Sequence, residues 1–132
     1  FGCGPGPALA AMLREAGYRV ALYDPFYAPD ESVLQPDYDF ITATEVVEHL
    51  ARPDAELRRL VGLLRPGGWL GIMTKLVIDR ERFAGWHYTR DPTHIGFFSR
   101  ETFAWWAERE GGALTFADKD VILLRRVGCS CR

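Results

Sequence analysis

The sequence predicts a doubly wound α/β fold, with a mostly parallel sheet and an antiparallel edge strand. Three observations predict it. A glycine-rich turn leads directly into an amphipathic helix, apolar runs of strand length recur along the chain, and helical patterns separate these runs. A length of 132 residues is enough for one domain with its own core, so we expect a single domain over 1–132.

The first half of the chain is expected to contain one helix and one strand before a long loop. The helix is predicted at 7–16 and ends at Gly17, a residue typical of helix C-termini. Its apolar face carries Leu9, Met12, Leu13 and Ala16. A strand is expected at 19–23. The following segment, 25–37, contains three prolines and is predicted to be a loop with at most one helical turn.

The middle of the chain continues the alternation. The apolar run 38–43 predicts a strand buried on both faces, as parallel strands are. The next helix is expected to begin at Pro53, in the first-turn position that proline favours, and to be stopped by the Pro-Gly-Gly sequence at 66–68. A further strand is predicted at 69–73.

The C-terminal part is expected to hold one more helix and a hairpin. Ser99 predicts the N-cap of a helix that ends at Gly111. Two closing strands, around 114–116 and 121–124, predict the antiparallel edge of the sheet. The segment 75–98, between the predicted strand 69–73 and the helix capped by Ser99, is expected to be a loop on the ligand side of the sheet.

Composition narrows the range of functions. The net charge is −2 and the isoelectric point is near 5.9, so we expect no nucleic-acid partner. No apolar run approaches the roughly 20 residues that span a bilayer, and we expect a cytoplasmic protein without a membrane partner. The composition carries no signal for an oligomeric state. The CxC pair Cys129 and Cys131 lacks a second pair of ligands at a metal-binding spacing.

The first six residues form the most informative motif of the chain. Gly2, Gly4 and Gly6 give a GxGxG turn whose backbone can approach a nucleotide-like ligand without side chains in the way. Pro7 stands where a dinucleotide fingerprint needs a third small residue, which counts against NAD and FAD. Asp24 follows Gly6 by 18 residues and is placed to bind ribose hydroxyls; the alternative is that it only forms a turn.

On these motifs the chain resembles the class I S-adenosylmethionine-dependent methyltransferases, over nearly its whole length. The motifs, in the order of that family, are Phe1–Gly6, Tyr23-Asp24, Tyr38–Leu50 and Leu64–Leu70. The segment from Trp86 to Ser99 also recurs in the bacterial type 11/12/23 enzymes. The resemblance implies a Rossmann-like fold, abbreviated on the adenine side, with S-adenosylmethionine as cofactor and a small molecule as acceptor.

The resemblance also implies that Gly2, Gly4, Gly6, Asp24, Thr44 and Glu45 bind the cofactor. The segment 25–37 is too short for the strand, helix and adenine-binding acid of the family, so the adenine contact is expected from Phe26 or Tyr27, whose alternative role is surface packing. The chain begins inside the part that resembles the family's first strand, so we expect that residues upstream of Phe1 are missing. The substrate side is expected to be the loop 75–98.

Candidate catalytic residues are His94, His87 and Glu45. Methyl transfer from a sulfonium is an in-line displacement, so the protein aligns the partners and removes a proton where the acceptor is a hydroxyl. Histidine titrates near neutral pH and suits that task. The alternative is that the aromatic residues of the loop form core and the histidines bind backbone carbonyls.

Two further hypotheses stay open. Glu45, Glu48, His49 and His94 match an ExxEH stretch with a later histidine that holds a divalent metal in small-RNA 2′-O-methyltransferases. We expect no metal, because the same string occurs in metal-free relatives and the chain lacks a basic surface for RNA. The other hypothesis is a non-catalytic domain that binds the cofactor.

Overall fold

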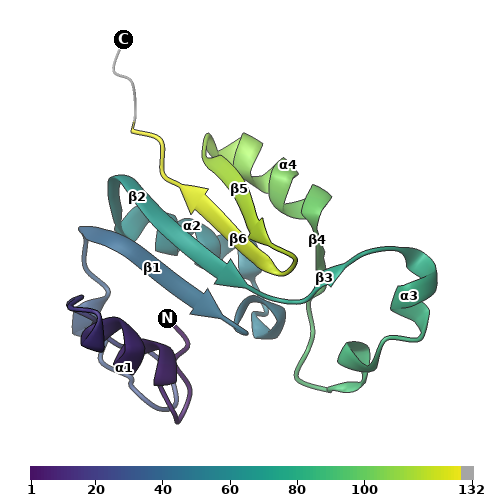
Figure 1. The fold of residues 1–132 in the computed structure, drawn as a ribbon, viewed down its shortest axis with the longest axis horizontal. Helices are drawn as coiled ribbons and strands as arrows, with labels where there is room; N and C mark the ends of the chain where they lie inside the picture. Colours follow the sequence, from purple (N-terminus) through teal and green to yellow (C-terminus); the bar gives the residue numbers. More distant parts are fainter. Residues whose placement is uncertain (129–132) are drawn as a thin grey trace.

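The computed structural model describes residues 1–128, which form a four-stranded mixed sheet with flanking helices (Figure 1). The strands are β1 (Tyr38–Thr44), β2 (Leu64–Met73), β5 (Ala113–Asp118) and β6 (Val121–Arg125), in the spatial order β1-β2-β6-β5. β1 and β2 are parallel, whereas β6 runs antiparallel to both β2 and β5. The α/β class and the antiparallel edge are therefore confirmed, but the four-stranded sheet is mixed, with one parallel and two antiparallel pairs, and not mostly parallel as expected.

Three helices of at least two turns accompany the sheet: α1 (Ala8–Glu15), α2 (Pro53–Leu63) and α4 (Arg100–Glu110). The ends of α4 follow the predicted signals. Ser99 caps α4 by accepting a hydrogen bond from the Thr102 backbone N–H at 3.2 Å, and Gly111 ends the helix in the left-handed conformation. A single 3₁₀ turn, η1 (Glu31–Val33), interrupts the predicted proline-rich loop.

The loop 75–98 leaves the sheet at the end of β2 and forms a separate lobe, at the right of Figure 1. It contains β3 (Leu76–Val77), α3 (Arg80–Ala84), η3 (His87–Arg90) and the start of β4 (Phe98–Ser99). β3 and β4 pair in parallel and close the base of the lobe. A short pair at the base restricts the loop to one orientation against the sheet.

The core lies between the sheet, α2 and α4. Its fully buried side chains are Leu60, Leu64, Leu70, Ile72, Phe103, Ile122 and Leu124. Phe98 and Phe103 pack with ring centroids 5.4 Å apart, which fixes the start of α4 against the core. Within residues 1–128, none of the helices has both the length and the apolar character needed to cross a membrane.

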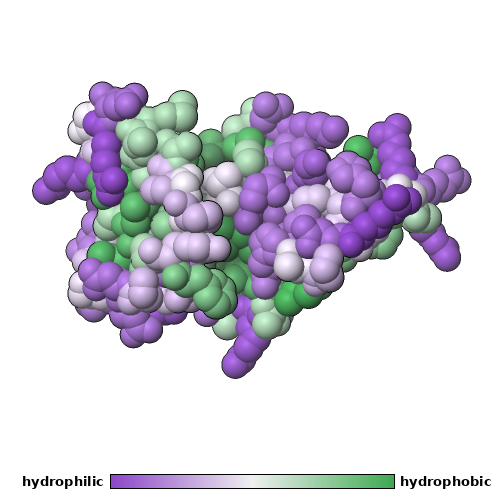
Figure 2. Space-filling view, turned by 90° about the horizontal axis from the view of Figure 1, so that it is seen from below, coloured by the Kyte–Doolittle hydropathy of each residue, from purple (hydrophilic) through white to green (hydrophobic). Residues whose placement is uncertain are grey.

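The N-terminal quarter differs from the prediction in two ways. The run 19–23 is not a strand, because the described chain gives it only one backbone hydrogen bond, from the Gly2 N–H to the Tyr23 carbonyl at 2.8 Å. The predicted apolar face of α1 is also largely uncovered, with Leu9 40% and Met12 65% exposed. Hydrophobic surface accordingly gathers on the α1 and β1 side of the molecule in Figure 2. A groove of about 660 Å³ beside β1 lies there and contains none of the predicted site residues.

The boundary between α2 and β2 also lies earlier than predicted. The helix ends at Leu63, and the Pro-Gly-Gly sequence at 66–68 is part of β2. Gly68 is buried between two strands, where an added Cβ would lie 2.9 Å from the Arg65 carbonyl oxygen and 3.1 Å from that of Asp39. Gly68 therefore permits close backbone approach within the sheet, and the Pro-Gly-Gly sequence does not stop the helix as predicted.

We expect Gly68→Ala to destabilise the fold by about 1–3 kcal/mol, because backbone oxygens on two strands must move to admit the methyl group. Urea unfolding measures the change in the free energy of unfolding. Gly85→Ala is the control, since no atom lies within 4 Å of an added Cβ there. Equal stability of the two variants would contradict the close approach of β1 and β2 at Gly68.

Candidate functional site

A cavity of about 660 Å³ lies between the glycine turn and the carboxyl end of β1. Among its lining residues are five that the sequence predicts for cofactor binding, namely Gly2, Gly4, Asp24, Phe26 and Glu45. They come from the glycine turn, from the segment after residue 23, and from the end of β1. Gly6 and Thr44, which were also predicted, do not line the cavity.

The glycine turn needs glycine at two positions. Gly2 has φ +69° and Gly4 has φ +62°, both in the left-handed region that other residues rarely adopt. An added Cβ at Gly2 would lie 2.4 Å from Cγ2 of Val46, so the turn packs directly on the segment that follows β1. Gly6 has no such φ and no neighbour within 4 Å of an added Cβ.

Asp24 is buried and fixes the shape of the cavity wall. Its Oδ1 accepts hydrogen bonds from the backbone N–H groups of Phe26 and Tyr27 at 2.8 and 3.1 Å, and Oδ2 accepts one from Gly4 at 2.9 Å. Burial alone would raise the pKa of Asp24, but these three donors outweigh it and lower the pKa. The carboxylate therefore forms the turn, as the alternative reading held, and Oδ2 retains a second acceptor position toward a ligand.

Glu45 lies at the end of β1 in a strained conformation. Its φ is +53°, the only positive value for a non-glycine residue in 1–128, and its N–H donates to the Met73 carbonyl at 2.8 Å. Its carboxylate accepts a hydrogen bond from the Tyr88 hydroxyl at 3.0 Å. Partial burial and then the neighbouring Glu48 raise the pKa of Glu45 above its ordinary value.

Glu48 has no exposed surface and lies behind Glu45 in η2 (Val47–His49). It accepts hydrogen bonds from the hydroxyls of Tyr88 at 2.5 Å and of Thr74 at 3.0 Å. Burial alone would raise the pKa of Glu48, but hydrogen bonds, first with Tyr88 and then with Glu45, outweigh it and lower the pKa. Burial and the adjacent Glu48 raise the pKa of Tyr88, so its hydroxyl stays protonated and donates.

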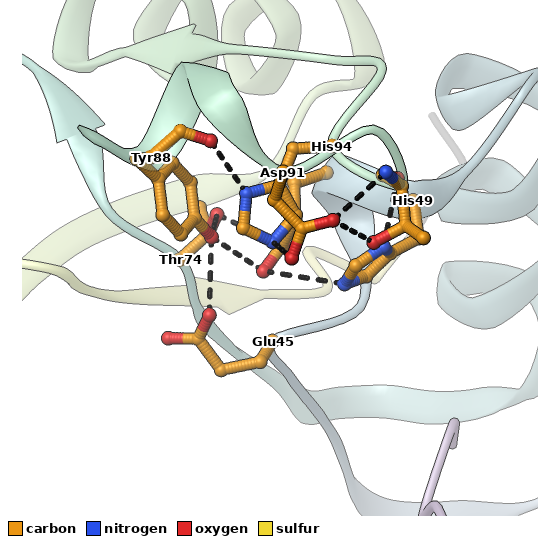
Figure 3. Close-up of polar contacts among 8 residues, drawn as sticks. Glu45, His49, Thr74, Tyr88, Asp91 and His94 are labelled. Atoms are coloured by element: carbon orange, nitrogen blue, oxygen red, sulfur yellow. Dashed lines mark hydrogen bonds and ion pairs between the residues drawn. The ribbon is translucent and has the colours of Figure 1, made fainter. Parts of the chain in front are cut away.

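His49 and His94 lie side by side, with ring centroids 4.8 Å apart (Figure 3). The Nδ1 of His49 is 2.8 Å from the Thr93 carbonyl, and the Nδ1 of His94 is 2.7 Å from the Tyr88 carbonyl. Because a carbonyl only accepts, each Nδ1 carries a proton, which leaves Nε2 of each ring for a further contact. His87 is not part of this group: it lines a separate, smaller cavity beside α3.

The structure brings together three of the four residues of the metal hypothesis. Ligand atoms of Glu48, His49 and His94 lie within 4.8 Å of one another, whereas Glu45 is not part of that cluster. The predicted tail pair Cys129 and Cys131 lies outside the described residues. Both imidazoles are oriented by backbone carbonyls through the ring nitrogen that would not bind metal.

Tyr88 and Thr74 are the residues that sequence reasoning missed. Tyr88 was grouped with the aromatic residues of the loop, and Thr74 follows β2 without any distinctive spacing. Their role depends on burial next to Glu48, with 6% and 0% of their surfaces exposed. The available signal was Glu48, a carboxylate among the apolar residues of Val46–Leu50. A buried charged group needs hydrogen-bond donors from elsewhere in the fold.

Comparison with known proteins agrees with this geometry. A family model described as a methyltransferase domain matches residues 1–115. The chain belongs to the methyltransferase domain family. No curated protein sequence matches it. S-adenosylmethionine is the methyl donor of the family.

Solved structures share the fold at low sequence identity. The structure of LaPhzM superposes with a TM-score of 0.73 at 19% identity, over 96% of this chain and 48% of that one. Human N-acetylserotonin methyltransferase in complex with S-adenosylmethionine gives 0.58 at 16% identity, over 92% and 39%. A possible histamine N-methyltransferase of Thermotoga maritima gives 0.53 at 19%, over 92% and 70%. The chain thus spans about half the length of the first of these proteins.

In this methyltransferase domain we expect Tyr88→Phe and Glu48→Gln to move the pKa of Glu45 in opposite directions. Tyr88→Phe removes a donor to the carboxylate and raises the pKa, whereas Glu48→Gln removes a neighbouring negative charge and lowers it. Carboxyl-detected NMR titration of Glu45 measures both shifts. Tyr27→Phe is the control, because Tyr27 lines the same cavity without a contact to Glu45. Shifts of the same sign would refute the hydrogen-bonded chain from Glu45 through Tyr88 to Glu48.

Proposed function

We propose that this domain transfers a methyl group from S-adenosylmethionine to a small-molecule acceptor held by the loop 75–98. The observation that carries the proposal is the cavity of about 660 Å³, where five residues predicted to bind the cofactor meet. A volume between about 300 and 1,000 Å³ is typical of cofactor and small-molecule sites. The acceptor side is assigned to the loop because its Tyr88 reaches Glu45, which lines the same cavity.

The residues of the cavity fit a nucleoside-type cofactor. No atom lies within 4 Å of an added Cβ at Gly4, so a ligand can approach the backbone there. Asp24 presents the free acceptor position of Oδ2 for a ribose hydroxyl, and the exposed ring of Phe26 offers an apolar face for adenine. Gly2 and Glu45 line the remaining wall, toward the methionine end. When bound, S-adenosylmethionine supplies a methyl group that is already activated for displacement.

Proton removal from the acceptor is assigned to Glu45, with His94 as the second candidate. Glu45 lines the cavity, and its raised pKa brings it closer to the range useful for a general base. His94 is half-buried, with its Nδ1 at the Tyr88 carbonyl and its Nε2 3.6 Å from Oδ2 of Asp91. These contacts suit a residue that orients the loop, and proton removal is its second possible role. His87 lies in the smaller cavity and is assigned to the acceptor side.

We expect S-adenosylhomocysteine to stabilise the domain and NAD to leave its stability unchanged. A ligand that binds only the folded state adds roughly 2.7 kcal/mol at a hundredfold excess over its dissociation constant. Pro7 stands where a dinucleotide fingerprint requires close helix packing, which disfavours NAD. Thermal unfolding with each ligand measures the difference. Equal stabilisation by NAD would contradict the proposal.

Two glycine variants locate the binding. Gly2→Ala places a methyl group into Val46 at φ +69° and is expected to abolish the response to S-adenosylhomocysteine, measured at a temperature where the variant remains folded. Gly6→Ala meets no atom within 4 Å and is expected to retain the response within a few-fold in affinity. Loss of binding in Gly6→Ala alone would place the ligand elsewhere.

A purely cofactor-binding domain would bind S-adenosylhomocysteine equally, but would turn over no acceptor.

A second candidate is metal-assisted transfer to a hydroxyl, the chemistry that the small-RNA enzymes use. The observation in its favour is the cluster of Glu48, His49 and His94, in which each imidazole is held at Nδ1 by a backbone carbonyl. Against it, Glu48 already accepts hydrogen bonds at both oxygens and has no exposed surface. The net charge of −2 also gives no attraction for RNA. We therefore keep the metal-free reading as the proposal.

We expect Mn²⁺ to leave the thermal stability of the domain unchanged, and EDTA to do the same, because the carboxylate of the cluster is occupied by two hydroxyl donors. The measurement is thermal unfolding with and without each reagent. His94→Ala is the matched variant, since it removes one ligand of the cluster. Stabilisation by Mn²⁺ that is present in the parent and lost in His94→Ala would establish the metal site and favour the second candidate.

A further inference from the structure

One face of α2 forms a second polar wall of the cavity beside the glycine turn. Arg52, Glu56 and Arg59 line that cavity. Their spacing of i, i+4 and i+7 places them on one side of the helix and of the residue that precedes it. The wall therefore combines two guanidinium groups, which only donate hydrogen bonds, with one carboxylate, which only accepts them.

The carboxylate of Glu56 has room for a further hydrogen bond. Its ion pair within residues 1–128 is with Arg59, and the distance of 3.7 Å between Oε2 and Nη1 is longer than a hydrogen bond. The side chain is 33% exposed. An ionised carboxylate offers about four acceptor positions, so a donor group of a ligand in the cavity would find an acceptor at Glu56.

The proposed ribose contact determines where the base of the cofactor lies. Asp24 Oδ2 is the atom assigned to the ribose, and the base is bonded directly to that sugar. Asp24 Oδ1 holds the backbone N–H groups of Phe26 and Tyr27 at 2.8 and 3.1 Å, so both aromatic residues are fixed beside the same point. They are 85% and 60% exposed and line the same cavity as Glu56. A base that stacks on either ring therefore lies in the cavity that the α2 face lines.

Adenine has the hydrogen-bonding groups that suit this wall. Its exocyclic amino group donates hydrogen bonds, and its flat ring stacks on aromatic side chains. Hypoxanthine has a carbonyl oxygen in place of that amino group, and two acceptors that face each other form no hydrogen bond. Of the three charged residues on the α2 face, only Glu56 can accept from an amino group.

Given the proposed function, on which this inference rests, we propose that Glu56 determines the specificity for the base of the cofactor. Its carboxylate accepts a hydrogen bond from the adenine amino group, while the ring stacks on Phe26 or Tyr27. The contact comes from the helix after β1, so it requires no acid in the short segment 25–37.

S-adenosylhomocysteine and S-inosylhomocysteine test this contact, because the amino group of the first is a carbonyl oxygen in the second. We expect the full chain to bind S-adenosylhomocysteine about tenfold more tightly, measured by isothermal titration calorimetry. Glu56→Ala should reduce this preference to about twofold or less, by weakening S-adenosylhomocysteine. Glu56→Gln should also reduce it, by strengthening S-inosylhomocysteine, because an amide can donate to the carbonyl oxygen. Glu108→Ala is the control and should keep the preference, since Glu108 is exposed on α4 and does not line the cavity.

The outcomes separate this inference from the proposed function. An equal loss of both ligands in Glu56→Ala overturns the inference, because the carboxylate would then bind a part that the two ligands share. A parent chain without a preference overturns it as well, and so does a loss in Glu108→Ala equal to that in Glu56→Ala. Each of these results leaves methyl transfer standing while S-adenosylhomocysteine binds the parent. Failure of S-adenosylhomocysteine to bind the parent overturns the proposed function and this inference with it.

Discussion

The site depends on one carboxylate without exposed surface, that of Glu48. Its side chain accepts hydrogen bonds from Tyr88 and Thr74, and its backbone carbonyl accepts those of Ile95 and Gly96 at 2.8 and 3.0 Å. One residue therefore joins the turn after β1, the end of β2 and two points of the loop 75–98. A buried donor that loses its partner costs about 1–3 kcal/mol, so these contacts favour one position of the loop.

The two sides of the site are built by different means. The proposed cofactor side is shaped by backbone: two glycines with positive φ, and Asp24, which accepts three backbone N–H groups. The proposed acceptor side is shaped by side chains of the loop 75–98, among them Tyr88, which contacts Glu45. Solved structures at 16–19% identity share the fold. In our proposal, the lobe accounts for the choice of acceptor.

Local sequence signals predicted where helices begin and end better than they predicted which segments pair as strands. Ser99 and Gly111 marked α4 because capping depends on a few neighbouring residues. The run 19–23 did not become a strand, because strand formation requires a partner that periodicity does not specify. The cavity residues Gly2, Gly4 and Asp24 were predictable from a motif at fixed spacing. Tyr88 was not, because its position beside Glu48 depends on how the whole lobe folds back.

The central claim is that the cavity beside the glycine turn holds the methyl donor, with Glu45 and Tyr88 at its acceptor end. A crystal structure of the domain with S-adenosylhomocysteine tests it most directly. The account predicts the ribose at Asp24, the sulfur toward Glu45, and the hydrogen bond from Tyr88 to Glu48 retained. S-adenosylhomocysteine bound in the groove beside residues 19–23, or an ion that replaces Tyr88 at Glu48, would contradict it.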